Sequence, residues 1–293
     1  MSVTTGPTPG RSVGAATSWK SVLDRAATVS YYLAMSLLAL GFLLPLIWMV
    51  SSSVKPEADI LTVPPRFLPS TVTFANYVQA WPVILPYFLN SVKVAALSVG
   101  GLLVTAPLAG YAFARLRFPG RDALFLVLIG SALIPHVAYL IPQYIVFRDY
   151  GWLDTQYPLW VPRAFTPIFG TFLMRQFFKA LPQELEDAAK IDGAGTFTVY
   201  WRIMLPLAKP ALAAIGIFTF VESWNDLLGP LIFINSPELQ TLPVALALFQ
   251  GQFFTQVSAL MAAATVTIVP VLLVFVFCQR YFIAGLASTG LKA

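Results

Sequence analysis

The sequence predicts an all-α integral membrane protein whose chain crosses the bilayer six times. Of its 293 residues, 58% are hydrophobic and only 11% are charged, and the mean hydropathy is +0.76. A soluble domain carries about 25% charged residues, so this chain cannot cover a water-facing surface of its size. The 23 Phe, 11 Tyr and 7 Trp residues argue against intrinsic disorder. With a soluble domain and a disordered chain excluded, the composition indicates a polytopic membrane protein.

The elements follow from the apolar runs, because one membrane-spanning helix needs about 20 apolar residues. Residues 1–29 are rich in Gly, Pro, Ser and Thr, lack a signal-peptide pattern and predict a flexible tail. Residues 30–85 hold the first span and a proline-rich extracytoplasmic loop that cannot be helical throughout. Residues 86–281 form the main transmembrane domain, and residues 282–293 a C-terminal tail. The predicted spans are residues 31–50, 88–114, 123–147, 158–178, 207–234 and 258–281.

The basic residues predict the orientation of the chain. Six crossings place both termini on one side of the membrane, together with most of the Lys and Arg residues. Basic residues collect on the cytoplasmic face, so we expect both tails to be cytoplasmic. The pI of about 9.3 then reflects topology, and no nucleic-acid partner is needed to explain it. Lys93 falls inside the second span, and the opposite side would hold Lys55, Arg66, Arg148 and Arg163.

The long cytoplasmic loop at residues 182–206 predicts two short helices separated by a kink. Pro182 suits the first turn of a helix, and acidic residues follow where the helix dipole favours negative charge. Gly193 suits a left-handed stop, which carries no steric cost for glycine. Thr196 can cap the second helix, and Pro206 can end it.

Small residues give the first of these helices a distinctive face. Leu185, Ala188 and Ala189 are spaced three and four residues apart, so they are expected to share one side of the helix. A face of alanine lets the backbone of another protein approach closely. The alternative is an amphipathic loop lying on lipid headgroups. The residues alone leave both interpretations open.

The same loop resembles the EAA loop of bacterial ATP-binding-cassette (ABC) importer permeases. The resemblance lies in Asp187-Ala188-Ala189-x-x-Asp192-Gly193-Ala194, followed by Leu205-Pro206-Leu207. The segments 172–178 and 224–226 are similar to the carbohydrate-uptake branch of the family, to which the maltose permeases belong. Asp187 stands where the family usually has glutamate, which keeps the charge while shortening the reach by one methylene. The resemblance covers roughly residues 86–290.

This resemblance implies a type I ABC importer fold and a non-catalytic permease subunit of the bacterial cytoplasmic (inner) membrane. Such a subunit forms half of a translocation pathway for a sugar or related solute and works by alternating access. The implied partners are a second homologous permease, a cytoplasmic ATPase dimer that binds ATP and Mg²⁺, an extracytoplasmic substrate-binding protein and membrane lipid. The residues implied in coupling to the ATPase are Glu186, Asp187, Ala188, Ala189, Asp192, Gly193 and Ala194.

Polar residues in the fifth span mark a candidate translocation pathway. Glu222, Asn225 and Asp226 follow i, i+3, i+4 spacing and are expected to share a helix face. A charge at the bilayer centre costs about 2.5–3.5 kcal/mol, so this face is expected to line a wet pathway or to form a hydrogen-bond cluster between helices. Trp224 could stack on a sugar ring or simply pack against neighbouring helices.

The sequence lacks the residues that ATP binding, metal binding or enzyme activity would require. No G-x-x-x-x-G-K-[ST] loop occurs, so the chain is not expected to bind ATP in that way. With one histidine, His136, and one cysteine, Cys278, the chain offers no metal cluster and no Ser-His-Asp centre, so we expect no metal, no cofactor and no enzyme activity. His136 is expected to be a packing residue.

Two alternatives stay open. An ion-coupled secondary transporter would use titratable groups inside the membrane, such as Glu222, Asp226 and His136, but it usually also has an internal repeat, which we do not find. Such a transporter would leave residues 182–206 unexplained. An ABC permease for glycerol-3-phosphate would share the permease type and differ only in its solute.

Overall fold

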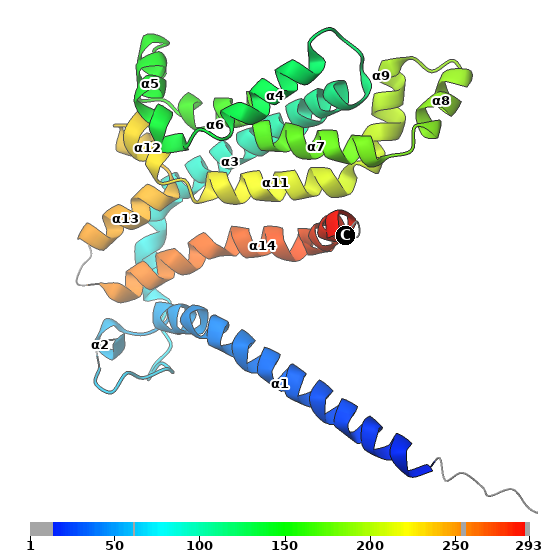
Figure 1. The fold of residues 1–293 in the computed structure, drawn as a ribbon. Coiled ribbons are helices and arrows are strands. Elements are labelled where there is room, and N and C mark those ends of the chain that lie inside the picture. Colours follow the sequence, from blue (N-terminus) through cyan, green and yellow to red (C-terminus); the bar gives the residue numbers. More distant parts are fainter. Residues whose placement is uncertain (1–13, 61, 253–255, 291–293) are drawn as a thin grey trace, which may run out of the picture.

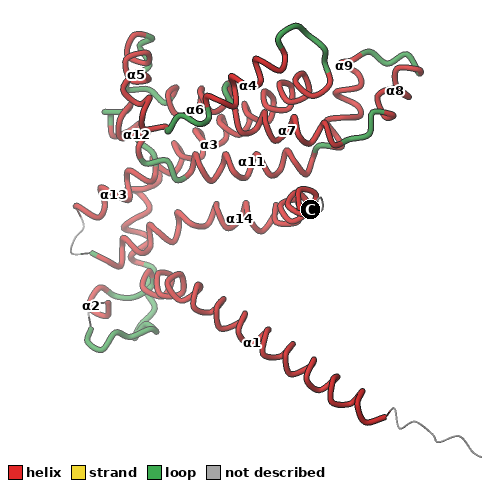
Figure 2. Tube along the Cα trace, in the orientation of Figure 1, coloured by secondary structure: helices red, strands yellow, loops and turns green. Residues whose placement is uncertain are grey.

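Helices joined by loops make up the part of the chain that the structure describes. The structure is a computed structural model, and it describes residues 14–60, 62–252 and 256–290. Figure 1 shows a body of packed helices from which one long helix, α1, projects. No strand occurs within the described residues (Figure 2). The prediction of an all-α fold is confirmed.

The first helix is longer than predicted. α1 spans Gly14–Ser53, so it contains the predicted span 31–50 and extends well before it. Residues 14–29 of the predicted tail are therefore helical, and residues 1–13 lie outside the described part of the chain. Most apolar side chains of α1 are exposed, and α1 contacts the rest of the chain mainly through α14 (Val257–Gly290).

The second span, α3 (Ala75–Arg115), is the central helix of the body. The predicted proline-rich loop ends earlier than expected, because Pro82 and Pro86 lie inside α3. Proline is tolerated in membrane helices when neighbouring groups satisfy the freed backbone. The loop itself carries a single short helix, α2 (Glu57–Ile60). Besides α14, the main neighbours of α3 are α6 (Tyr157–Phe165), α7 (Ile168–Ala180) and α11 (Lys209–Trp224).

Three of the predicted spans are each broken into two helices. The third span bends by 101° between its two halves, with Pro135 at the start of the second half. The fourth span breaks at Thr166 and Pro167, between α6 and α7. The fifth breaks after Trp224, so the predicted helix 207–234 is not continuous. The third span consists of α4 (Arg121–Ser131) and α5 (His136–Asp149). The fifth consists of α11 followed by α12 (Leu228–Phe233).

Length and composition identify three described helices that could cross a membrane, or up to five if each strongly bent pair counts as one span. The number of six spans and the cytoplasmic location of the termini stay predictions. The C-terminal tail is helical where the structure describes it, because α14 continues to Gly290, and residues 291–293 lie outside the described part. Besides α2, two elements between the last two predicted spans were not predicted: the 3₁₀ turn η2 (Pro237–Leu239) and α13 (Leu242–Gln252).

Two glycines let α3 approach its neighbours closely. A Cβ on Gly101 would overlap the Cβ of Ala164 in α6, and a Cβ on Gly110 would lie 2.5 Å from the Cβ of Met174 in α7. Such separations are far below van der Waals contact, so only glycine allows this packing. The residue before Gly101, Gly100, faces open space, with no atom within 4 Å of the position of a Cβ.

The adjacent pair Gly100 and Gly101 therefore provides a test of this packing. We expect Gly101→Ala to lower the stability of the purified chain by about 1–3 kcal/mol, because the added methyl group overpacks the contact with Ala164. Gly100→Ala is the matched control, and its better helix propensity should leave stability unchanged or raise it by about 0.5–1 kcal/mol. The thermal unfolding midpoint in detergent measures both effects. Equal midpoints for the two variants would contradict the close contact between α3 and α6.

Candidate functional site

The loop at residues 182–206 begins with the predicted helix and kink. α8 spans Glu184–Ile191, and Gly193 follows with φ of +80°. The amide of Gly193 donates to the carbonyl of Lys190 at 3.0 Å, and the amide of Ala194 donates to the carbonyl of Ala189 at 2.9 Å. This is the left-handed stop that the sequence predicts, and it reverses the chain immediately after the helix.

The second half of the loop differs from the prediction in two details. Gly195, not Thr196, occupies the capping position, and no side-chain cap hydrogen bond forms there. Pro206 lies within a helical turn instead of ending it, because the helix breaks two residues later, at Ala208. The elements are α9 (Thr196–Val199), a π-helical turn η1 (Tyr200–Met204) and α10 (Leu205–Leu207), and this run meets α11 at 72°.

An ion pair fastens α8 to the body of the molecule. Arg115 Nε, at the end of α3, lies 3.1 Å from Glu186 Oε1, and the two side chains are only 10% and 6% exposed. The same guanidinium donates to the carbonyls of Phe178 and Leu181, at 2.7 Å and 2.6 Å. Ala189, one turn further along α8, is buried in the core cluster that contains Phe178 and Tyr200. One side of α8 is therefore held against its own chain.

This arrangement corrects the predicted docking face. Ala189 is 9% exposed while Leu185 is 39% exposed, so Leu185, Ala188 and Ala189 do not form one exposed surface. Glu186 also points inward. The exposed side of α8 carries Leu185, Asp187, Ala188 and Ile191, and Asp192 and Gly193 follow it at the surface.

A second polar region lies where the three broken spans meet. A cavity of about 260 Å³ is lined by His136 at the start of α5, by Thr166 and Pro167 at the break between α6 and α7, and by Glu222 and Asp226 on either side of the end of α11. Discontinuous helices in membrane transport proteins commonly surround a binding site, because their ends expose unpaired backbone groups and polar side chains.

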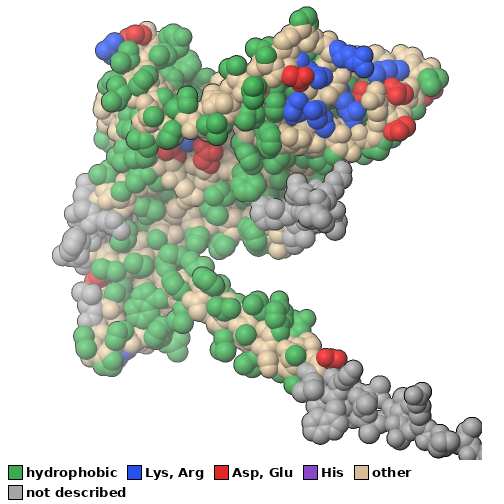
Figure 3. Space-filling model, viewed as in Figure 1, with side chains coloured by type: hydrophobic (Ala, Val, Ile, Leu, Met, Phe, Trp, Pro, Cys, Tyr) green, Lys and Arg blue, Asp and Glu red, His purple; other side chains and the backbone are tan. Residues whose placement is uncertain are grey.

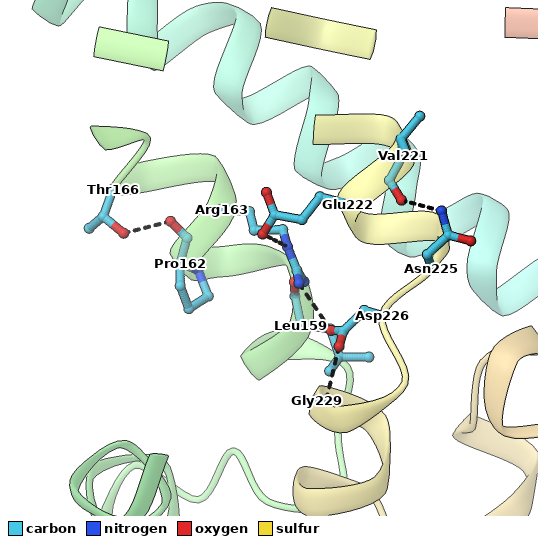
Figure 4. A network of polar contacts seen from close by, with 9 residues as sticks. All are labelled: Leu159, Pro162, Arg163, Thr166, Val221, Glu222, Asn225, Asp226 and Gly229. Carbon is cyan, nitrogen blue, oxygen red and sulfur yellow. Dashed lines mark hydrogen bonds and ion pairs between the residues drawn. The ribbon is translucent and has the colours of Figure 1, made fainter. Parts of the chain in front are cut away.

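One arginine connects the charged groups of this cavity (Figure 4). The guanidinium of Arg163 on α6 lies between two carboxylates, with Nη2 at 3.0 Å from Asp226 Oδ2 and Nε at 3.4 Å from Glu222 Oε1. Its third nitrogen donates to the carbonyl of Leu159. Asp226 also accepts a hydrogen bond at 3.0 Å from the amide of Gly229, in the first turn of α12.

The structure brings together only two of the four predicted pathway residues. Glu222 and Asp226 line the cavity, whereas Asn225 donates to the carbonyl of Val221 on its own helix at 2.8 Å. Because α11 ends at Trp224, Asp226 is no longer on a helix with Glu222, and the two carboxylates meet through Arg163 instead.

Trp224 is a packing residue in this chain. It is 1% exposed, its indole donates to the carbonyl of Thr267 at 3.1 Å, and its ring stacks on Phe220 at 5.4 Å. A buried ring offers no face to a sugar, so of the two interpretations that the sequence leaves open for Trp224, this conformation agrees with packing.

Arg163 and Gln143 are site residues that the sequence interpretation missed. The charge count assigns Arg163 to the extracytoplasmic side, although an arginine beside an apolar run is a marker of function in a membrane protein. Gln143 on α5 carries no signal in the sequence. Its Oε1 atom is buried in the cavity wall and accepts no hydrogen bond from any residue that the structure describes.

Broken spans around a polar cavity are typical of membrane transport proteins. Residues 10–288 match the family described as the binding-protein-dependent transport system inner membrane component. The chain belongs to this family.

Individual relatives agree with this assignment. The chain is 34% identical over 265 residues to the sulfoquinovosyl glycerol transport system permease protein SmoH of Agrobacterium fabrum, with 89% of this chain and 93% of the relative covered. It is 32% identical over 277 residues to the trehalose transport system permease protein SugB of Mycobacterium tuberculosis, covering 91% and 99%. A crystal structure of a bacterial ABC transporter that imports the acidic polysaccharide alginate contains a similar chain, with a TM-score of 0.78, 25% identity and coverage of 94% and 100%. The fold is thus that of an ABC importer permease.

Replacing Glu186 should release α8 from the body. We expect Glu186→Gln to leave the Arg115 charge uncompensated in a nearly buried position, at a cost of up to about 3–5 kcal/mol. Limited proteolysis within residues 182–206 of the purified chain should then become faster. The matched control is Asp187→Asn on the exposed side of α8, which should leave the cleavage rate unchanged. Equal cleavage rates in the two variants would show that the ion pair does not hold the loop.

Proposed function

We propose that this chain is one of two permease subunits of an ABC importer for a saccharide. It forms half of the translocation pathway in a bacterial cytoplasmic membrane. A cytoplasmic ATPase dimer binds ATP and Mg²⁺ and drives alternating access, and an extracytoplasmic binding protein delivers the solute. The chain itself supplies the pathway and the contact with the ATPase, not catalysis.

The attachment of α8 carries this proposal. A coupling element must transmit force without bending, so its inner side has to be fixed and its outer side has to be free. The inner side is fixed by the Glu186–Arg115 ion pair and by buried Ala189. The outer side exposes Ala188 beside Ile191, which is 87% exposed. An exposed side chain of that kind is expected to be covered by a partner protein.

The charge distribution supports a cytoplasmic location for this end of the molecule. In Figure 3, Lys and Arg side chains gather over the end that carries α8 and α9, while hydrophobic side chains are spread over the rest of the described surface in this view. This is the asymmetry that the positive-inside rule describes. The exposed apolar surface of α1 supports a location in the bilayer, beside lipid and a second homologous permease.

The names of the relatives support a saccharide as the solute. SmoH, SugB and the alginate importer are each described by a sugar or sugar derivative that they transport. A glycerol-3-phosphate permease stays an alternative of the same transporter type.

An ion-coupled secondary transporter would need titratable groups such as His136, Glu222 and Asp226, which line the cavity together, but the family match over residues 10–288 argues against it. The two candidates differ in their requirement for other subunits. We expect the purified chain alone, reconstituted in vesicles with a proton or sodium gradient, to take up none of a panel of labelled sugars. Vesicles that contain all four components and ATP on the ATPase side should accumulate one of them. Gradient-driven uptake by the single chain would favour the secondary transporter.

A glycine pair tests the coupling loop itself. Gly193 has φ of +80°, which L-residues rarely adopt, whereas Gly195 has φ of −72°. Because no atom lies within 4 Å of a Cβ at either position, Gly193→Val acts through backbone strain alone. We expect it to reduce sugar uptake by the complete importer while the ATPase keeps hydrolysing ATP and the chain still inserts. Gly195→Ala should preserve uptake, and normal uptake by Gly193→Val would exclude a rigid lever.

A further inference from the structure

The cavity between the broken spans has unused capacity for hydrogen bonding to a ligand. Gln143 lies on the cavity wall, and its buried Oε1 atom lacks a donor among the described residues. An unpaired buried acceptor is costly, so turning this amide toward the cavity to accept from a water molecule or a ligand is favourable. Glu222 contributes a carboxylate whose side chain is 69% exposed and which contacts Arg163 through a single oxygen at 3.4 Å. Both groups accept hydrogen bonds, so they suit a ligand that carries hydroxyl groups.

Aromatic rings form the apolar part of the same cavity. Phe169 on α7 and Phe218 on α11 contact each other edge to face at 5.9 Å, and Tyr139 on α5 lies on the wall that carries Gln143. Aromatic faces pack against the C–H faces of sugar rings, while a few polar groups set the orientation of the ligand. A volume of about 260 Å³ lies just below the usual range of about 300–1,000 Å³ for small-molecule pockets, so the space suits a single sugar ring better than a chain.

The charges of the cavity discriminate between kinds of sugar. Its wall carries one guanidinium and two carboxylates, a formal net charge of −1 with His136 counted as neutral. All three nitrogen atoms of Arg163 already face oxygen atoms, namely those of Glu222, Asp226 and the carbonyl of Leu159. An acidic substrate would therefore meet a negative wall and no free cation, and binding like charges in a partly enclosed site is unfavourable.

We propose that this cavity is a saccharide subsite contributed by this subunit and that it selects uncharged sugars over acidic ones. The proposal rests on the proposed function and adds the substrate class. It also separates this chain from the alginate importer, although the two folds are similar, because that transporter is described as carrying an acidic polysaccharide.

Cysteine protection tests the subsite in the complete importer in nanodiscs. Cys278 is the single cysteine, so Cys278→Ser gives a cysteine-free background in which Thr166→Cys places a thiol at the cavity wall. The measurement is the rate of alkylation by a neutral maleimide. The probes are the neutral sugars glucose, maltose and trehalose and the acidic sugars glucuronate and galacturonate. Thr198→Cys, on the exposed part of the loop, is the matched control for effects of the sugars on the reagent itself.

We expect at least one neutral sugar to slow alkylation at position 166, the uronates to have no effect there, and no sugar to have an effect at position 198. Equal or stronger protection by a uronate would overturn the charge selection. No protection by any sugar of the panel would overturn the subsite. ATP-dependent uptake measured on the same preparation shows independently whether the proposed function holds. A failure of the subsite can therefore be distinguished from a failure of the proposed function.

Charge variants complete the test. Glu222→Gln removes one negative charge and spares Asp226, which accepts a hydrogen bond from the first turn of α12 and is therefore more sensitive to substitution. We expect the ratio of protection by glucuronate to protection by glucose to rise on the order of tenfold in this variant. Glu238→Gln, which removes an exposed carboxylate outside the cavity, should leave the ratio unchanged. An unchanged ratio in Glu222→Gln would show that the carboxylate does not select the ligand.

Discussion

The close approach of α3 to α6 and α7 determines where both candidate sites lie. At Gly101 the missing Cβ allows contact with Ala164, which directly follows Arg163 in the chain. At the far end of the same helix, Arg115 pairs with Glu186 and donates to two carbonyls beside the end of α7. Because α3 is one continuous helix of 41 residues, about 60 Å long, a single element connects the cavity with the loop. That continuity is what a transporter needs if events at the loop are to reach the pathway.

The charged groups of the two sites differ in how deeply they are buried. The Arg115–Glu186 pair is nearly buried, so each charge depends on the other and the loop has little freedom to detach. The Arg163 cluster is more open: Asp226 is 16% exposed in its side chain, while Glu222 is 69% exposed. A closed pair holds a position, whereas an open cluster can exchange a contact for a ligand. This difference in burial suits the roles proposed above, a mechanical one for the Arg115–Glu186 pair and a binding one for the Arg163 cluster.

Much of the architecture was predictable because it follows from local properties of the chain. Apolar length located the long helices α1, α3 and α14, and the φ of +80° at Gly193 confirmed the turn expected after α8. The inward face of α8 was not predictable. Spacing placed Ala188 and Ala189 on one side with Leu185, but only contact with Tyr200 and its neighbours decides which alanine is buried. The sequence left the role of Trp224 open for the same reason, since the carbonyl and the rings that bury it come from α14, α3 and α11.

By itself the sequence determined that the protein is helical and membrane-embedded, that residues 182–206 form a kinked loop, and that its charges are unevenly distributed. These properties depend on composition and on residues close together in the chain, so hydropathy, glycine stereochemistry and charge counts are sufficient. Only the tertiary structure decided that Arg163 meets Glu222 and Asp226, which lie 59 and 63 residues away. The physical reason is that helix breaks reorient polar groups in directions that helical periodicity cannot predict. The partner of a charged residue inside a membrane protein therefore depends on which polar groups the packing places next to it.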